Sequence, residues 1–143
     1  MTSPSPCSSR RTVLRGAALA GAAGLGAVAC GGGGTGTRGP ATPTAPVDLG
    51  EPSGIPVGGA KLYREQRLVV SQPAKGEYKA FSAVCTHAGC VVDKLEDGKV
   101  SCPCHGSKFD VHTGKVLQGP AGAPLPAVPV KTSGGKLIAG PDA

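Results

Sequence analysis

The chain has 143 residues and a formal net charge of +6, and this length allows at most one ordinary domain. Its 24 glycines and 14 prolines, with only two Tyr, two Phe and no Trp, exclude a large aromatic core and favour short strands and turns. The basic residues are scattered singly, without the clustered cations and stacking aromatics that nucleic-acid binding needs. We therefore expect no nucleic-acid partner.

The first 29 residues predict an export signal. Arg10 and Arg11 precede residues 16–29, which contain only Gly, Ala, Leu and Val. A cationic start, an apolar run and small residues at the end are typical of a secretory signal, and a membrane-spanning helix needs a longer run of about 20 apolar residues. The pattern Ser9-Arg10-Arg11-x-x-Leu14 resembles the twin-arginine signal, which implies export of a protein already folded around its cofactor.

Cys30 directly follows the small residues Ala27-Val28-Ala29. Cleavage before Cys30 is expected either at an ordinary Ala-x-Ala site or at a signal that resembles those of bacterial lipoproteins, whose new N-terminal Cys is acylated. Cysteine counting favours acylation, because Cys30 would otherwise be an odd, exposed thiol in an exported protein. Residues 30–54 are rich in Gly, Pro and Thr, which predicts a lipid-anchored flexible linker.

Residues 55–143 form the predicted folded domain, in which short β-rich runs alternate with turn residues and no segment indicates a helix. Two hairpins are expected, one around Pro73-Ala74-Lys75-Gly76 and one around Glu96-Asp97-Gly98, where Asp-Gly between strands is a strong hairpin signal. The expected strands are residues 67–70, 78–84, 91–95, 99–101, 116–117, 127–131 and 136–139. The fold class is therefore predicted to be all-β.

The two hairpins lead into two Cys/His segments, Cys85-Thr86-His87-Ala88-Gly89-Cys90 and Cys102-Pro103-Cys104-His105-Gly106-Ser107. Two thiolates and two neutral imidazoles match tetrahedral metal chemistry, as zinc or as an iron-sulfur cluster. Composition alone leaves both metals open, although structural zinc sites rarely need the further Cys that each segment contains. The candidate ligands are Cys85, His87, Cys102 and His105.

These two motifs resemble those of the Rieske iron-sulfur proteins, over about residues 55–143. The resemblance implies a Rieske-type antiparallel β-sandwich with a small cluster-binding subdomain that holds a 2Fe-2S cluster. It assigns Cys85 and Cys102 to one iron and His87 and His105 to the other. It further implies a disulfide between Cys90 and Cys104, and Gly119-Pro120 resembles the proline loop that covers the cluster in this family.

Three positions bear on the reduction potential and on the partner that the resemblance implies. High-potential members of the family use a Ser and a Tyr to donate hydrogen bonds to the cluster sulfurs. Ser107 matches the first and Phe109 replaces the second, so we expect an intermediate potential. Ala88 stands where quinol-oxidising relatives usually carry Leu.

His112 is expected in a surface turn, and one spare His cannot build the mononuclear iron site of an oxygenase catalytic subunit.

The predicted function is electron transfer at the outer face of a bacterial membrane, by a lipid-anchored carrier without a catalytic site of its own. Its expected partner is a redox protein or a quinol-oxidising complex. The first alternative is the Rieske subunit of a cytochrome bc-type quinol oxidase or of another multi-subunit oxidoreductase. The others are the ferredoxin component of an oxygenase and a structural zinc domain.

Overall fold

The computed structural model describes residues 41–143. The predicted export signal with Arg10 and Arg11, and the predicted acylation of Cys30, lie outside these residues and stay predictions. Within residues 41–143, no helix is both long and apolar enough to cross a membrane.

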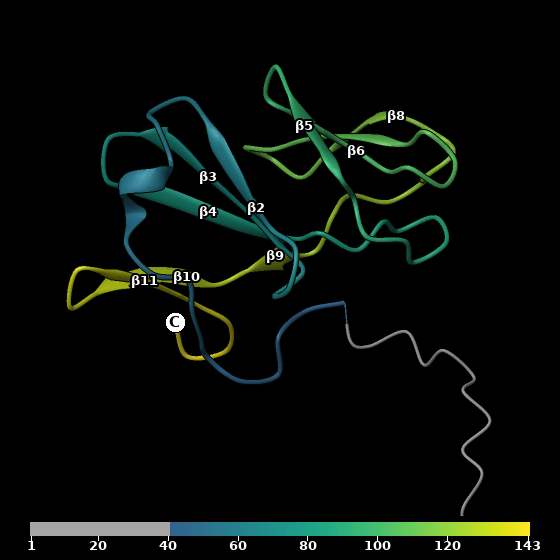
Figure 1. Cartoon of the computed structure of the whole chain (residues 1–143). Helices are drawn as coiled ribbons and strands as arrows, with labels where there is room; N and C mark the ends of the chain where they lie inside the picture. Colours follow the sequence, from purple (N-terminus) through teal and green to yellow (C-terminus); the bar gives the residue numbers. More distant parts are fainter. Residues whose placement is uncertain (1–40) are drawn as a thin grey trace, which may run out of the picture. The chain divides into compact units, whose positions relative to one another are not determined.

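The described residues form three antiparallel sheets (Figure 1), which confirms the predicted all-β class. The first sheet has the order β1-β11-β10, the second β2-β3-β4-β9 and the third β5-β6-β7-β8. One short 3-10 helix, η1 (Pro52–Gly54), follows β1. The strands are β1 (Val47–Asp48), β2 (Ala60–Tyr63), β3 (Leu68–Ala74), β4 (Glu77–Ser82), β5 (Lys94–Glu96), β6 (Lys99–Ser101), β7 (Lys108–Asp110), β8 (Val116–Gln118), β9 (Ala127–Val128), β10 (Val130–Ser133) and β11 (Lys136–Ala139).

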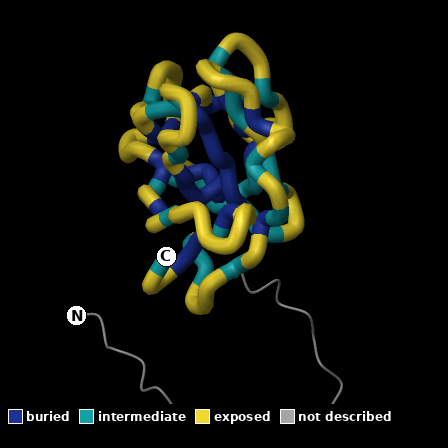
Figure 2. The backbone as a smooth tube through the Cα atoms, turned by 90° about the vertical axis from the view of Figure 1, so that its left-hand side faces the viewer, coloured by how far each residue is buried: buried dark blue, intermediate teal, exposed yellow. Residues whose placement is uncertain are grey.

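The β2-β3-β4-β9 sheet lies between two apolar cores. Successive side chains of a strand point to opposite faces, so Val69 and Phe81 enter one core and Leu68, Val70 and Ala80 the other. The first core is shared with the β5–β8 sheet and the second with the β1-β11-β10 sheet. Figure 2 shows the buried residues gathered inside, with exposed turns around them. Strand β3 is covered on both faces and therefore has no polar side, which explains the continuous apolar run Leu68-Val69-Val70 at its start.

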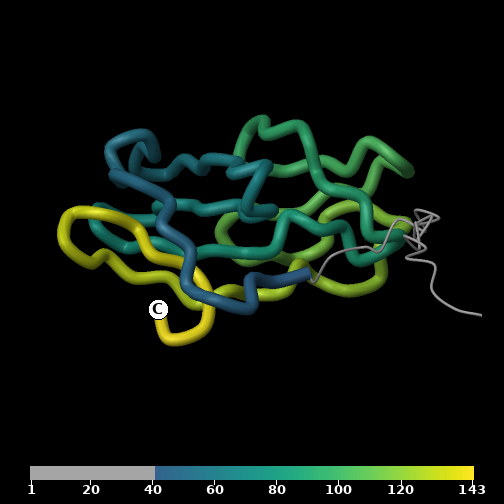
Figure 3. The backbone as a smooth tube through the Cα atoms, turned by 60° about the horizontal axis from the view of Figure 1, so that its bottom comes forward, coloured from purple at the N-terminus to yellow at the C-terminus, as the bar shows by residue number. Residues whose placement is uncertain are grey.

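The first strand lies inside the segment that we expected to be a linker, so the prediction for residues 30–54 is wrong from residue 47 onwards. Val47 pairs with Ala139 and Asp48 with Ile138, and Figure 3 shows this blue segment beside the yellow C-terminal hairpin. Leu49 is buried in the second core. The alternation of inward apolar and outward polar residues over three positions is too short to be recognised from sequence.

The other differences concern two missed strands and the bounds of others. β2 and β7 were not predicted, and the run 127–131 is divided into β9 and β10 at Pro129, which has no N–H to donate to a ladder. The Asp97-Gly98 hairpin is confirmed: both residues have positive φ, 48° and 71°, and they join β5 to β6. This is the geometry of a type I′ turn, which Asp-Gly favours.

Candidate metal centre

The first Cys/His segment folds into a tight loop at the end of β4. The Cys85 N–H donates to the Cys90 carbonyl at 2.7 Å, and the Gly89 N–H donates to the Cys85 carbonyl at 2.8 Å. Gly89 has φ of 76°, in the left-handed region that a residue with a Cβ rarely adopts. Backbone groups alone therefore make the hydrogen bonds that close the loop Cys-Thr-His-Ala-Gly-Cys, and the side chains of its Cys and His residues are not needed to close it.

The second segment, between β6 and β7, has the same backbone pattern. The Cys102 N–H donates to the Ser107 carbonyl at 2.8 Å, the Gly106 N–H donates to the Cys102 carbonyl at 3.0 Å, and φ of Gly106 is 76°. Gln118 at the end of β8 donates from Nε2 to the Gly106 carbonyl at 3.1 Å. By this pattern Cys85 corresponds to Cys102, so the two loops present their first Cys in equivalent positions.

The structure brings the four predicted ligands together as two pairs of like residues. Cys85 and Cys102 are buried, with 2% and 3% of their surface exposed, and the Cys85 thiol lies close enough to raise the pKa of the Cys102 thiol. His87 and His105 are exposed, and their ring centroids are 4.7 Å apart with an interplanar angle of 83°. Each pair takes one member from each loop, so the thiols form the inner end of the site and the imidazoles the outer end.

The surroundings of Cys102 act on the pKa of its thiol in opposite directions. Burial raises the pKa of the Cys102 thiol, whereas backbone hydrogen bonds from Cys104 and His105 to the same sulfur act in the opposite direction, and the neighbouring Cys85 thiol raises this pKa again. Burial without a positive partner disfavours a free thiolate. A cation bound at this sulfur would supply that partner, which fits the role of a metal ligand.

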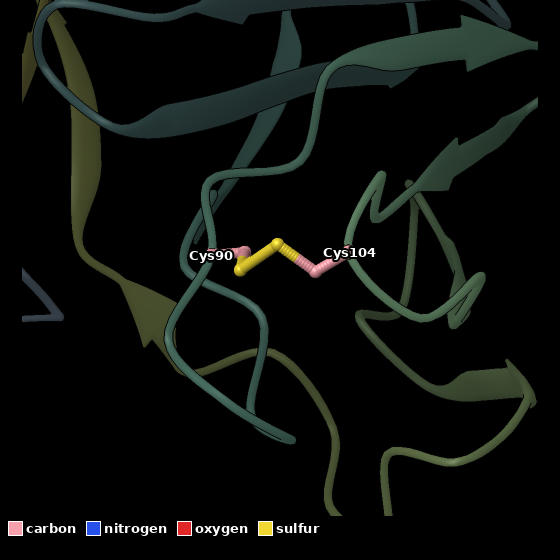
Figure 4. The surroundings of a disulfide bond; sticks show 2 residues. All are labelled: Cys90 and Cys104. Carbon is pink, nitrogen blue, oxygen red and sulfur yellow. A yellow bond between two sulfur atoms is a disulfide. The ribbon is translucent and has the colours of Figure 1, made fainter.

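The predicted disulfide between Cys90 and Cys104 is confirmed and joins the two loops (Figure 4), with the Cα atoms 6.5 Å apart. It closes a ring of about 15 residues, which stabilises the folded chain by roughly 3 kcal/mol in the chain-entropy model. The bond therefore holds the facing loops together.

A third segment, residues 118–125, is hydrogen-bonded to both loops. The Ala121 N–H donates to Oγ of the buried Ser107 at 3.0 Å, and Oγ1 of Thr86 donates to the Ala123 carbonyl at 2.6 Å. The peptide between Gly119 and Pro120 is cis. Contacts of Thr86 and Ala121 were not predicted, because no local pattern indicates a partner 37 or 14 residues away.

The two predicted tuning residues are both buried without exposed surface, Ser107 and Phe109. Oγ of Ser107 accepts the Ala121 N–H, so the hydroxyl hydrogen remains to be donated. Phe109 packs in the core beneath the loops and offers no such hydrogen. His112 lies in the turn after β7, where its N–H donates to Oδ1 of Asp110 at 2.9 Å, and it is partly exposed.

The geometry suits two metal ions better than one. In a tetrahedral zinc site, with Zn–S of about 2.3 Å and Zn–N of about 2.0–2.1 Å, the ligand atoms all lie within about 4 Å of one another. Within residues 41–143, the sulfurs that gather within 4.8 Å are those of Cys90, Cys102 and Cys104, and the disulfide occupies two of these. A thiol pair beside an imidazole pair instead fits a two-metal cluster with like ligands on each metal.

Fold and site together define a small all-β iron-sulfur protein. Residues 39–129 match the family model for the Rieske [2Fe-2S] domain. The chain belongs to this family, which confirms the predicted fold type, and its cofactor is a Rieske-type 2Fe-2S cluster.

Relatives and solved structures agree with this assignment. The chain is 37% identical over 94 residues to a cytochrome b6-f complex iron-sulfur subunit of Chlorobaculum tepidum, covering 63% of this chain and 50% of that protein. It is 52% identical over 64 residues to a putative respiratory nitrate reductase subunit Rieske of Haloferax mediterranei, covering 43% and 29%. The plasma membrane Rieske protein PetC3 of Synechocystis PCC 6803 is similar in structure, with a TM-score of 0.52, 31% identity, and coverage of 65% and 97%. The chain thus spans half or less of the two curated relatives.

Proposed function

We propose that this protein carries single electrons on a 2Fe-2S cluster held by Cys85, His87, Cys102 and His105. The observation that carries the proposal is the pairing of ligands across the loops, with the thiols buried and the imidazole rings exposed and 4.7 Å apart. When bound, the cluster supplies reversible one-electron transfer at potentials of roughly −150 to +300 mV, because two neutral imidazoles replace two thiolates.

The residues around the site have distinct tasks in this proposal. The buried thiols keep water from the inner end, and the exposed imidazole rings give a partner its closest approach. Ser107 is placed to donate its free hydroxyl hydrogen toward the cluster sulfurs, since its oxygen already accepts the Ala121 N–H. Such a donor stabilises the more negative reduced state and raises the potential. Phe109 has no hydroxyl, which supports an intermediate potential.

We further propose that the protein works at the outer face of a bacterial membrane, anchored through a lipid on Cys30 after a twin-arginine-type signal containing Arg10 and Arg11. The Cys90–Cys104 disulfide supports this location, because such bonds persist in oxidising compartments. The similarity to a protein described as a plasma membrane Rieske protein also supports it. Mass spectrometry of the mature N-terminus tests the anchor: unmodified Cys30 in the membrane fraction would contradict it.

A second candidate function is that of an electron-transfer subunit in a quinol-oxidising complex. The relatives described as cytochrome b6-f iron-sulfur subunits favour it, whereas Ala88 and Phe109 differ from the residues usual in that role. Isolation of the native protein decides between the two. Co-purification with a cytochrome b and loss of quinol oxidation on deletion support the subunit, and isolation without them supports the independent carrier.

The ligand assignment is tested by metal content and spectroscopy of the purified protein. We expect about two irons and two acid-labile sulfides per chain, and loss of the visible absorption in His87→Ser and His105→Ser. His112→Ser is the matched control, because this third His lies in the turn bound to Asp110 and should leave the cluster intact. A colourless protein with one zinc per chain would instead support the structural zinc domain.

A further inference from the structure

Three sulfur atoms gather at the inner end of the two loops. Sγ of Cys90, Cys102 and Cys104 all lie within 4.8 Å of one another. Two of them form the disulfide, whereas Cys102 is free and buried. A free thiol is therefore held close to a disulfide bond, and thiol-disulfide exchange requires such proximity.

We propose that Cys102 exchanges with the Cys90–Cys104 disulfide whenever the cluster is missing, and that cluster binding prevents the exchange. In this reaction the Cys102 thiol first loses its proton, which burial disfavours and which makes the exchange slow, and its Sγ then attacks Sγ of Cys90. The bond between Cys90 and Cys104 breaks, a bond between Cys90 and Cys102 forms, and the electron pair leaves with Sγ of Cys104. The proton that Cys102 loses is gained by Cys104, so the reaction needs no oxidant or reductant.

The positions of the three residues favour attack at Cys90 over attack at Cys104. Attack at Cys90 releases Cys104, which is exposed, so that water solvates the leaving sulfur. Attack at Cys104 would release Cys90, which is only partly exposed, and would close a small ring across Pro103 alone, which the geometry of disulfides disfavours. The expected product therefore has a Cys90–Cys102 bond and a solvent-exposed Cys104 thiol.

The exchange links the disulfide to the metal site in both directions. A sulfur bound to iron is not free to attack, so a loaded cluster preserves the Cys90–Cys104 bond. After exchange, Cys102 is consumed and one of the four proposed ligands is lost, so the chain cannot be loaded until the bond is exchanged back. Only this protective effect rests on the proposed function; the exchange itself concerns the cluster-free chain.

The decisive comparison uses two full-length variants that both lack one proposed ligand. Cys85→Ser keeps the attacking Cys102, whereas Cys102→Ser removes it. Each metal-free protein is incubated without oxygen, its free thiols are then trapped with N-ethylmaleimide in denaturant, and the tryptic peptides are sequenced by mass spectrometry. Residues 100–108 form one tryptic peptide that contains both Cys102 and Cys104, and fragmentation between Cys102 and Pro103 shows which of them carries the label.

We expect the label in Cys85→Ser to move with time from Cys102 to Cys104 until most of the peptide carries it there. In Cys102→Ser, the Cys90–Cys104 bond should persist and Cys104 should stay unlabelled. A label that remains on Cys102 in metal-free Cys85→Ser overturns the proposal. Wild-type protein stripped of iron by a chelator repeats the measurement without any substitution. If the wild type bound no iron, the proposed function would fail, yet movement of the label would still establish the exchange.

Discussion

Replacing Ser107 with Ala tests the part of the site where structure and reduction potential meet. The side chain is fully buried, and its oxygen accepts the Ala121 N–H at 3.0 Å. The substitution leaves this buried N–H without a partner, which costs about 1–3 kcal/mol. For a domain of this size, each kcal/mol lowers the melting temperature by roughly 4–8 °C, so we expect a clear fall in the melting temperature.

The same substitution removes the hydroxyl hydrogen that we assign to a cluster sulfur. A donor that favours the reduced cluster by about 1.4 kcal/mol corresponds to about 59 mV for a one-electron couple. We therefore expect voltammetry of the loaded protein to show a potential lower by about 60 mV. Ser101→Ala is the matched control, because Ser101 lies in β6 outside both loops, and it should change neither quantity.

The two measurements separate the two roles of Ser107. A lower melting temperature with an unchanged potential would mean that Ser107 only holds the 118–125 segment, and the tuning argument would be refuted. A lower potential together with the lower melting temperature supports both roles.

Three further substitutions address the tuning, the packing and the acid stability of the domain. Phe109→Tyr adds a hydroxyl beneath the loops and should raise the potential in voltammetry, whereas a stability loss at constant potential would count against it. Gly114→Ala should cost about 2–5 kcal/mol in urea unfolding, from the left-handed conformation and overpacking, because φ is +70° and the new Cβ would lie 2.7 Å from the ring of Phe81. Gly134→Ala, with φ of +56° and open space, should show only the backbone part, and equal losses would exclude the steric contact. Burial alone would raise the pKa of Asp110, but hydrogen bonds from the following turn hold it below its ordinary value. Its stabilising effect is therefore present above the unfolded pKa and lost as the pH falls through the folded one. The melting temperature should therefore fall below about pH 4, and Asp110→Asn should make this fall smaller. An equal fall in the variant would contradict the stabilising role of the Asp110 carboxylate.

Local sequence signals predicted the elements that depend on neighbouring residues alone. Asp97-Gly98 specifies its hairpin because both positions require positive φ. Each Cys/His segment likewise contains its own Gly at the left-handed position, Gly89 and Gly106, so the loop conformation and the ligand types are written within six residues. The disulfide was predicted from resemblance to a family and not from geometry.

Only the tertiary structure decided how these pieces meet. Val47 was assigned to a linker because its partner in β11 is distant in sequence, and a two-residue strand has no recognisable pattern of its own. Which Cys lies beside which, and which His ring lies beside which, depends on the docking of two loops that the β5–β6 hairpin separates. The hydrogen bond from Ala121 to Ser107 arises only when β8 and β9 are in place. The residues thus determined the chemistry that each loop can offer. The packing of the sheets determined that the thiols lie together inside and the imidazoles lie together at the surface. Such non-local contacts depend on which faces the cores bring together.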